Sequence, residues 1–342
     1  MRAAVCRSYG APESISVEGD YPAPVLAPGQ VRVRVEAAAV NFPDVLFMAN
    51  QYQMTIPVPF VPGSEFAGVV VEGASGFAVG DRVMGTVMVG AFAEEVVVAP
   101  RSLTRIPSSV SAETAAAFGV AHRTAYHALR TIAEVAPGER LVVLGAGGGV
   151  GLAAVQLGAV LGLDVTAVAS SDEKLAVAAS CGASHCINHK TTPSGLRAAL
   201  RDVHPDGTDV VIDPVGGDLA EPALRSLRWA GRFVTIGYAA GPIPKIPLNL
   251  VLLKGCKILG FQIRDLSANV PESVARDEAE LHELLASGKV TPHIGASFTL
   301  AAAAAALRHV ADGKAIGKVV LSCVSQGGFA APSTPQRGET PL

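Results

Sequence analysis

The sequence is poor in charge and in aromatic side chains. Lys, Arg, Asp and Glu make up 17% of the 342 residues, Phe, Trp and Tyr make up 5%, and the formal net charge is −3. Because positive charge is not in excess, the composition suggests neither nucleic acid nor an acidic lipid surface as a partner. The apolar fraction of 49% excludes a disordered chain and indicates an α/β protein of about two domains.

Cysteine is also scarce. The five cysteines are Cys6, Cys181, Cys186, Cys256 and Cys323, an odd number without C-x-x-C spacing. This set predicts free thiols in the cytoplasm rather than a disulfide framework. The N-terminus lacks the long apolar core of a signal peptide, which supports the same expectation. The segment from Ser325 onward is rich in Pro, Gly, Ser and Thr, and we expect it to be a mobile tail (325–342).

One long uncharged run, Leu141–Leu163, has the length of a membrane span but not its internal order. Five glycines lie within Gly145–Gly151, and each costs a helix about 1 kcal/mol relative to alanine. The residues before them, LVVL, suit a buried strand, and those after them suit a buried helix. The run therefore predicts a strand, a glycine turn and a helix.

The chain divides into regions of different texture. Residues 1–123 contain short apolar strands separated by Pro-Gly and Gly-Asp turns, which favours an irregular barrel or sandwich. In residues 124–262 helical runs alternate with apolar strands, which predicts a parallel sheet with crossover helices. Residues 263–324 contain helical stretches at 279–286 and 301–311 and a last strand, GKVVLS, which we expect to return to the first domain. The predicted fold class is α/β.

Gly145, Gly148 and Gly151 form a G-x-x-G-x-x-G pattern between the predicted strand and helix. Small residues there let the backbone approach a pyrophosphate, and the helix N-terminus offers unpaired N–H donors and a favourable dipole. Tight packing of strand on helix would explain the same glycines. A second strand, DVTAVA, follows in the order that a dinucleotide-binding Rossmann unit requires, so we predict such a site.

The end of that second strand indicates which dinucleotide is bound. An acid at Ala169 would accept a hydrogen bond from a ribose 2′-hydroxyl, but none is present. Ser170, Ser171 and Lys174 instead offer hydroxyl donors and a cation, which suit a 2′-phosphate. A capping box from Ser170 to Glu173 with a solvated Lys174 would explain the same residues. We expect NADPH in preference to NADH.

The segment GERLVVLGAGGGVGLAAVQLGAVLG resembles the signature of the quinone oxidoreductase (zeta-crystallin-like) branch of the medium-chain dehydrogenase/reductase superfamily. The segments PFVPGSEFAGVV, DPVGGD and GKAIGKVVLS are similar to other parts of that branch, and the resemblance covers residues 1–322. It implies a GroES-like catalytic domain beside a Rossmann domain, commonly in a homodimer. It also implies reduction of a quinone, by hydride or electron transfer from NADPH, in the cleft between the domains.

The resemblance implies a set of site residues. Asn41, Asp44 and Tyr52 would line the quinone pocket. The cofactor would contact Thr124, Gly145, Gly148, Gly149, Val150, Gly151, Ser170, Ser171, Lys174, His189, Gly237, Phe261 within Gly260–Gln262, and Lys318.

Two positions depart from the pattern of the branch. His189 stands where the branch commonly has a tyrosine near the adenosine phosphate, and a histidine can also contact a phosphate. His122 and Arg123 replace small and apolar residues before Thr124. They either reshape the substrate pocket or face the surface.

The residue types of a zinc site are missing. Zinc-dependent relatives have a Cys in the segment that matches Asn41–Asp44 and a His in the segment that matches Gly63–Glu65, and neither is present here. A catalytic zinc needs about three protein ligands. Cys181, His185, Cys186 and His189 lie close in sequence, but a short strand would turn their side chains to opposite faces. We predict no metal, chemistry carried by the nicotinamide, and a hydrogen bond from Tyr52 to the quinone.

Two other functions remain open. A reductase of α,β-unsaturated carbonyls or enoyl thioesters would need an acid such as Tyr52 or His122 near the substrate. An NADPH-binding sensor or RNA-binding protein with little turnover is the other alternative, although the acidic balance argues against RNA.

Overall fold

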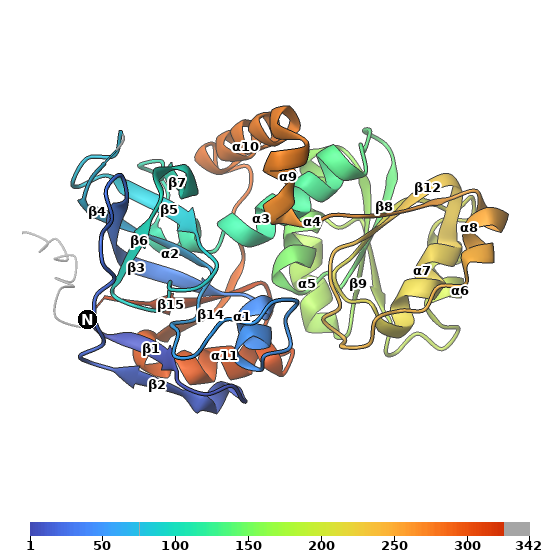
Figure 1. Ribbon diagram of the computed structural model, residues 1–342. Helices are drawn as coiled ribbons and strands as arrows, with labels where there is room; N and C mark the ends of the chain where they lie inside the picture. The colour runs from blue at the N-terminus through green and yellow to red at the C-terminus, as the bar shows by residue number, and fades with distance from the viewer. Residues whose placement is uncertain (75, 325–342) are drawn as a thin grey trace, which may run out of the picture.

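The computed structural model describes residues 1–74 and 76–324, so the predicted mobile tail lies outside the described residues. Figure 1 shows two lobes side by side, one built on antiparallel strands and the other on a parallel sheet. The predicted α/β fold class, a doubly wound parallel sheet joined to a β-rich domain, is confirmed.

The β-rich lobe contains a sheet in the order β14-β15-β3-β4-β5-β7, with β6 paired to β3 and a small β1-β2 sheet beside it. Its strands are β1 (Ala3–Cys6), β2 (Ile15–Glu18), β3 (Val31–Val40), β4 (Glu65–Glu72), β5 (Arg82–Thr86), β6 (Glu95–Val98), β7 (Leu103–Arg105), β14 (Ile294–Thr299) and β15 (Lys318–Ser322). Helices α1 (Phe42–Met48), α2 (Ala112–Ala116) and α11 (Ala303–Ala311) pack around the sheet. Strand β15 pairs with β3, so the C-terminal segment completes the sheet of this lobe.

The second lobe has a six-stranded parallel sheet in the order β10-β9-β8-β11-β12-β13. Its strands are β8 (Arg140–Leu144), β9 (Asp164–Ala169), β10 (His185–Asn188), β11 (Thr208–Asp213), β12 (Leu227–Thr235) and β13 (Lys257–Gly260). Its helices are α3 (Gly119–His127), α4 (Gly149–Val160), α5 (Asp172–Ser180), α6 (Leu196–Val203), α7 (Ala220–Ser226) and α8 (Leu248–Lys254). The strand order reverses at β8, which is the position where such sheets bind ligands.

Two further helices, α9 (Ile263–Asn269) and α10 (Pro271–Ala286), connect the lobes, and α10 packs against α3. Helix α10 begins eight residues earlier than the predicted stretch 279–286. Its first turns are polar and carry no apolar stripe. A search for hydrophobic periodicity therefore does not detect them.

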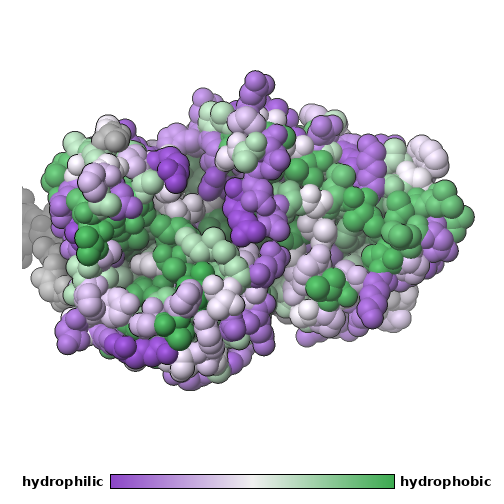
Figure 2. Space-filling model, in the orientation of Figure 1, coloured by the Kyte–Doolittle hydropathy of each residue, from purple (hydrophilic) through white to green (hydrophobic). Residues whose placement is uncertain are grey.

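The uncharged run Leu141–Leu163, which has the length of a membrane span, is mostly buried in the second lobe. All four residues of Leu141–Leu144 are inaccessible to solvent, and α4 is buried along most of its length. Among the described residues, no helix is long and apolar enough to cross a bilayer. Apolar side chains do gather at the surface of the second lobe far from the first (Figure 2), where Trp229, Leu252 and Leu253 are each more than 70% exposed.

Candidate active site

The glycine turn lies at the carboxyl end of β8, where the strand order reverses. Gly145 has a φ of +61°, a left-handed conformation that favours glycine. A Cβ atom on Gly151 would lie 2.1 Å from the Gly145 carbonyl oxygen, so only glycine permits this contact. The first amides of α4, at Gly149 and Val150, have no acceptor within the helix. The turn therefore fits an anionic pyrophosphate.

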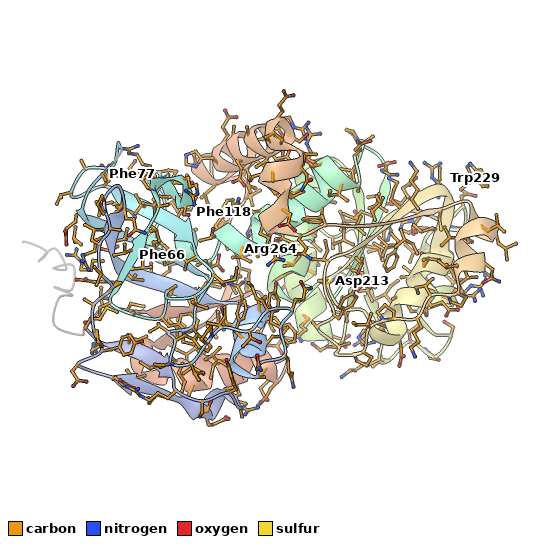
Figure 3. All side chains as sticks on the ribbon, in the orientation of Figure 1. Phe66, Phe77, Phe118, Asp213, Trp229 and Arg264 are labelled. Atoms are coloured by element: carbon orange, nitrogen blue, oxygen red, sulfur yellow. The ribbon has the colours of Figure 1, made fainter. Side chains whose placement is uncertain are left out.

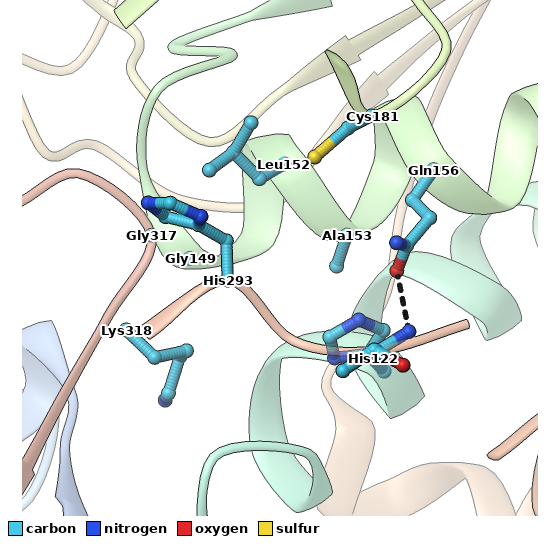
Figure 4. Close-up of a pocket in the computed structure, with 10 residues that line it drawn as sticks. His122, Gly149, Leu152, Ala153, Gln156, Cys181, His293, Gly317 and Lys318 are labelled. Carbon is cyan, nitrogen blue, oxygen red and sulfur yellow. Dashed lines mark hydrogen bonds between the residues drawn. The ribbon is translucent and has the colours of Figure 1, made fainter. Parts of the chain in front are cut away.

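The C-terminal strand contacts the outer side of this turn. The Gly317 N–H donates to the Gly147 carbonyl oxygen at 2.8 Å, and Gly317 forms a bridge with Gly148. The Lys318 stem lies beside Gly149, at 3.0 Å from where a Cβ of that residue would be. Figure 4 shows the small cavity left between these elements, whose volume of about 10 Å³ has room for about one water.

Lys318 joins the turn to the predicted quinone side. Its ammonium donates to Asn41 Oδ1 at 2.7 Å and to Glu65 Oε1. The Asn41 amide donates in turn to Glu65 Oε1 at 2.9 Å and to Ser64 Oγ at 3.1 Å. The Lys318 and Glu65 side chains are 4% and 1% exposed, so their charges are compensated within this cluster. We call Asn41, Ser64, Glu65 and Lys318 the lysine cluster.

Asp44 lies beside the lysine cluster in the first turn of α1. Its Oδ2 accepts a hydrogen bond from the Asn41 backbone N–H at 2.7 Å, whereas Oδ1 has no hydrogen-bond partner among the described residues. Burial raises the pKa of Asp44 to about 7, although the hydrogen bond from Asn41 acts in the opposite direction. Near neutral pH, this carboxyl group is therefore divided between its protonated and ionised forms.

Tyr52 follows α1 and is half-buried. Its ring packs against Phe47 with centroids 4.5 Å apart, and its hydroxyl makes no hydrogen bond within the described parts of the chain. Arg264 of α9 reaches the same loop, with Nη1 3.7 Å from Met54 Sδ, and Figure 3 shows it between the two lobes. The Tyr52 hydroxyl is thus available to a ligand.

The predicted adenosine-side residues lie together at the carboxyl ends of β9 and β10. Ser170 and Ser171 follow β9, and the His189 N–H donates to the Ala169 carbonyl oxygen at 3.1 Å. Burial lowers the pKa of His189, so at pH 7 this residue offers a hydrogen bond rather than a charge.

Lys174 extends from α5 across the glycine turn. A Cβ on Gly147 would lie 2.6 Å from the Lys174 stem, and the ammonium donates to the Gly313 carbonyl oxygen at 2.8 Å. The Lys174 N–H donates to Ser171 Oγ at 3.3 Å, which makes Ser171 the N-cap of α5. The capping box considered from the sequence, with its cap at Ser170, is therefore wrong, and Ser170 is not used as the cap.

The predicted nicotinamide-side residues come from three separate elements. The Thr124 hydroxyl donates to the Val120 carbonyl oxygen of its own helix, α3, at 2.7 Å. The Gly237 N–H follows β12 and is 3.4 Å from the Asp213 carbonyl oxygen. Phe261 directly follows β13 and is half-buried. These intramolecular hydrogen bonds do not bring the three residues together, so their contact with a nicotinamide stays a prediction.

His122 and Arg123 point in different directions. His122 is buried, stacks on Phe118 with centroids 4.5 Å apart and lines the small cavity of Figure 4. Burial lowers the pKa of His122 to about 3, so its ring is neutral. Arg123 instead forms an ion pair with Glu278 of α10 at 2.5 Å. His122 therefore faces the cavity beside the glycine turn, and Arg123 faces α10, so a role of either residue in the substrate pocket stays a prediction.

The donor set does not fit zinc. Within the described ranges, no group of three or more His, Cys, Asp or Glu side chains is arranged to hold a metal ion. The segments that match the zinc-binding segments of relatives supply Asn41, Asp44, Ser64 and Glu65, and the Lys318 ammonium already occupies Glu65 Oε1. Zinc prefers thiolate and imidazole ligands, and a cation among the donors opposes a second one.

Sequence reasoning did not identify two acidic residues. Glu65 was considered only as part of a missing zinc motif, but it also accepts a hydrogen bond from the Val120 N–H at 2.7 Å and so links β4 to α3. Asp213 ends β11 (Figure 3), where its Oδ1 accepts from the Val215 and Gly216 N–H groups at 2.8 Å each. For Asp213, the sequence offered one local signal, an acidic residue at the end of a buried strand and directly before Pro-Val-Gly-Gly.

Comparisons with known proteins agree with this architecture. Residues 27–108 match the alcohol dehydrogenase GroES-like domain, and residues 149–279 match the zinc-binding dehydrogenase family. The chain is 38% identical to quinone oxidoreductase-like protein 2 of Bos taurus over 327 residues, which cover 94% of this chain and 92% of the relative.

Solved structures give the same result. The quinone oxidoreductase of Thermus thermophilus, also solved in complex with NADPH, has a TM-score of 0.81 and 35% identity, with 94% of this chain and 100% of that chain covered. A mycobacterial protein complexed with NADPH has a TM-score of 0.87 and 27% identity, with the same coverage. The chain thus belongs to the quinone oxidoreductase branch of the medium-chain dehydrogenase/reductase superfamily.

Proposed function

We propose that this protein uses NADPH to reduce quinones without zinc. The observation that carries the proposal is the lysine cluster, because an ammonium lies where the chemistry of a zinc-dependent relative would need a metal ion. The names of the relatives, which include quinone oxidoreductases solved with NADPH, support the choice of cofactor and substrate class.

The cofactor would lie along the glycine turn. The amides at the start of α4 would hold the pyrophosphate, and Ser170 and Lys174 would bind the 2′-phosphate. NADPH bound there would supply a hydride, and one proton from solvent or from an acidic side chain would complete the hydroquinone.

The protein's own residues position the quinone and hold a proton. Tyr52 would donate a hydrogen bond to a quinone oxygen, since its hydroxyl has no other hydrogen bond within the described parts of the chain. The lysine cluster fixes the orientation of Asn41, and Asp44 behind it carries a proton in part of the molecules at pH 7. These residues orient the acceptor, which is the contribution expected of a protein that leaves the redox chemistry to its cofactor.

The decisive experiment measures oxidation of NADPH and NADH by chelator-treated protein. The acceptors are a benzoquinone, an ortho-quinone, an α,β-unsaturated ketone and an enoyl thioester. We expect rapid NADPH oxidation with the quinones only, unaffected by the chelator. Turnover of the unsaturated carbonyls alone would assign the protein as a C=C reductase. Cofactor binding without turnover would favour a sensor or binding protein.

The Tyr52→Phe variant tests the proposed hydrogen bond. We expect kcat/KM for benzoquinone to fall about ten-fold, the effect of one lost hydrogen bond of about 1.4 kcal/mol in the transition state. The thermal midpoint should stay unchanged, because the Tyr52 hydroxyl makes no hydrogen bond within the described residues. An unchanged kcat/KM would remove Tyr52 from the site.

We also propose that the protein is a cytoplasmic homodimer. The free cysteines support a reducing compartment. Strand β13 has an unpaired edge among the described strands, and Trp229, Leu248, Leu252 and Leu253 are exposed beside it, which favours pairing with a second copy. Light scattering should give a dimer that Leu252→Glu disrupts. Val79→Glu, at an exposed position on the other lobe, should leave it intact.

A further inference from the structure

A second cavity, of about 190 Å³, lies in the Rossmann lobe away from the glycine turn. It is lined by α6 from Arg197 onward, by the C-terminal ends of α7 and α8, and by the residues that precede β11 and begin β12. The glycine turn follows the carboxyl end of β8, and all strands of this sheet are parallel. The cavity lies beside the amino ends of β11 and β12, so it is at the opposite end of the strands from the glycine turn. Nothing proposed above uses it.

The cavity is strongly cationic in a chain whose net charge is −3. Five lining side chains carry a positive charge, and Asp206 is the one carboxylate among the lining residues. The cations are Arg197, Arg201, Arg225, Arg228 and Lys254.

Only two of these cations have carboxylate partners within the described part of the chain. Arg225 pairs with Glu221 at 2.7 Å, and Arg228 pairs with Asp209. Arg197, Arg201 and Lys254 form no ion pair within the described residues. The two arginines are four residues apart on one face of α6, an arrangement that destabilises a helix by about 0.2–0.5 kcal/mol unless an anion compensates it.

Helix capping explains part of this arrangement but not all of it. Arg201, Arg225 and Lys254 lie in the last turns of their helices, where a cation offsets the negative end of the dipole. Arg197 is the second residue of α6, where the dipole disfavours a cation. The three helix ends that meet there are C-termini, whose dipoles disfavour an anion, so only the cations beyond those that capping requires can favour one.

We propose that this cavity binds a small ligand that carries two or more phosphate groups. The planar fork of arginine suits phosphate oxygens, and Arg197 and Arg201 have no carboxylate partner within the described residues. The Ser226 hydroxyl also lines the cavity, but it donates its proton to the Ala223 carbonyl oxygen at 2.7 Å, so the cationic side chains must supply the contacts to phosphate. An open hollow with five cations and one carboxylate fits a compact diphosphate better than a nucleic acid strand, which needs a continuous basic groove with stacking side chains.

The test is calorimetric titration of pyrophosphate into the full-length protein in its solution oligomeric state. NADP⁺ is saturating, so the glycine turn is occupied, and sodium chloride holds the ionic strength constant. We expect one pyrophosphate per chain. In the double variant Arg197→Gln/Arg201→Gln, the affinity should fall at least about ten-fold, because two charge-assisted contacts are lost.

Matched controls separate a site from general charge. Arg101→Gln/Lys289→Gln removes two exposed cations elsewhere and should leave the pyrophosphate affinity unchanged. Equal losses in both double variants would reduce the cavity to general electrostatic attraction and overturn the proposal. Loss of affinity in Lys174→Ala instead would place the pyrophosphate on the glycine turn, with the same consequence.

Two further outcomes would also overturn the proposal. These are an absence of pyrophosphate binding, and tight binding of a single-stranded oligoribonucleotide that pyrophosphate does not displace. The cavity does not depend on the proposed reaction. A protein inactive toward every quinone could still bind pyrophosphate here, and an active quinone reductase could fail to do so.

Discussion

Lys318 and Glu65 form an ion pair in which both side chains are almost completely buried, at 4% and 1% exposed. Each also hydrogen-bonds to the Asn41 side chain, so the pair holds together β15, β4 and the start of α1. Buried charges of this kind depend on each other, because removal of one leaves the other uncompensated. The pair therefore links the stability of the fold to the orientation of Asn41.

The first prediction is a strong energetic coupling in this pair. Lys318→Met and Glu65→Gln should each lower the free energy of unfolding by about 3–5 kcal/mol, since each leaves a buried polar group without its partner. The double variant should lose at least about 2 kcal/mol less than the sum, as judged by urea unfolding. The exposed pair Arg308–Glu13 provides the control, and its double-mutant cycle should show a much weaker coupling because solvent screens it. Additive losses at Lys318 and Glu65 would contradict the observed geometry.

The second prediction concerns Asp44 and pH. The folded protein holds this proton up to a pKa of about 7, whereas the unfolded chain releases it near 3.8. A pKa raised on folding contributes stability that is complete below pH 3.8 and is lost as the pH rises toward 7. The loss is on the order of 4 kcal/mol at most. Asp44→Asn does not titrate, so its stability relative to wild type should increase from pH 4 to pH 7.5.

Denaturant unfolding at a series of pH values checks this second prediction. The asparagine can still accept the hydrogen bond from the Asn41 backbone N–H, which keeps the cap of α1. Parallel stability curves for wild type and variant would mean that Asp44 titrates normally in the folded protein.

The Rossmann lobe was predictable because its signals are local. The buried strand LVVL, the glycines and the next strand DVTAVA lie within 30 residues of each other, and their order alone specifies the unit. The structure confirms the parallel sheet and the crossover helices.

The lysine cluster was not predictable because its partners are far apart in sequence. Lys318 and Glu65 are separated by 253 residues, and no local spacing indicates that they meet. The same holds for His122 and Arg123, which are neighbours on α3. Helix α3 lies between α4 and α10, so adjacent residues face different surroundings. Helix α10 gives Arg123 an ionic partner, Glu278, that is 155 residues away in the sequence, so no local pattern indicates this contact.

The third prediction compares two glycines of the turn. Gly151→Ala would place a Cβ 2.1 Å from the Gly145 carbonyl oxygen, so the backbone must shift. We expect a loss of about 1–3 kcal/mol in the free energy of unfolding, together with loss of NADPH binding.

Gly148→Ala is the matched control for Gly151→Ala. Its backbone is extended, with a φ of −88°, and the nearest atom to its Cβ would be 3.5 Å away. Its stability should change by less than about 0.5 kcal/mol. Equal stabilities of the two variants would show that the turn is more plastic than this geometry implies.

The last prediction tests which dinucleotide the site selects. The Lys174 ammonium contacts only the Gly313 carbonyl oxygen among the described residues, and it lies across the glycine turn, so a 2′-phosphate can take the place of that oxygen. Lys174→Ala should weaken NADPH binding by about 10- to 100-fold, the value of one hydrogen bond to a charged group. NADH has no 2′-phosphate, so its affinity should change less than about three-fold. Lys289→Ala, which removes an exposed cation elsewhere, should alter neither affinity. Fluorescence titration of both dinucleotides gives the ratio directly. Equal losses for NADPH and NADH would mean that Lys174 supports the turn through Gly147 and Gly313 and never meets the phosphate.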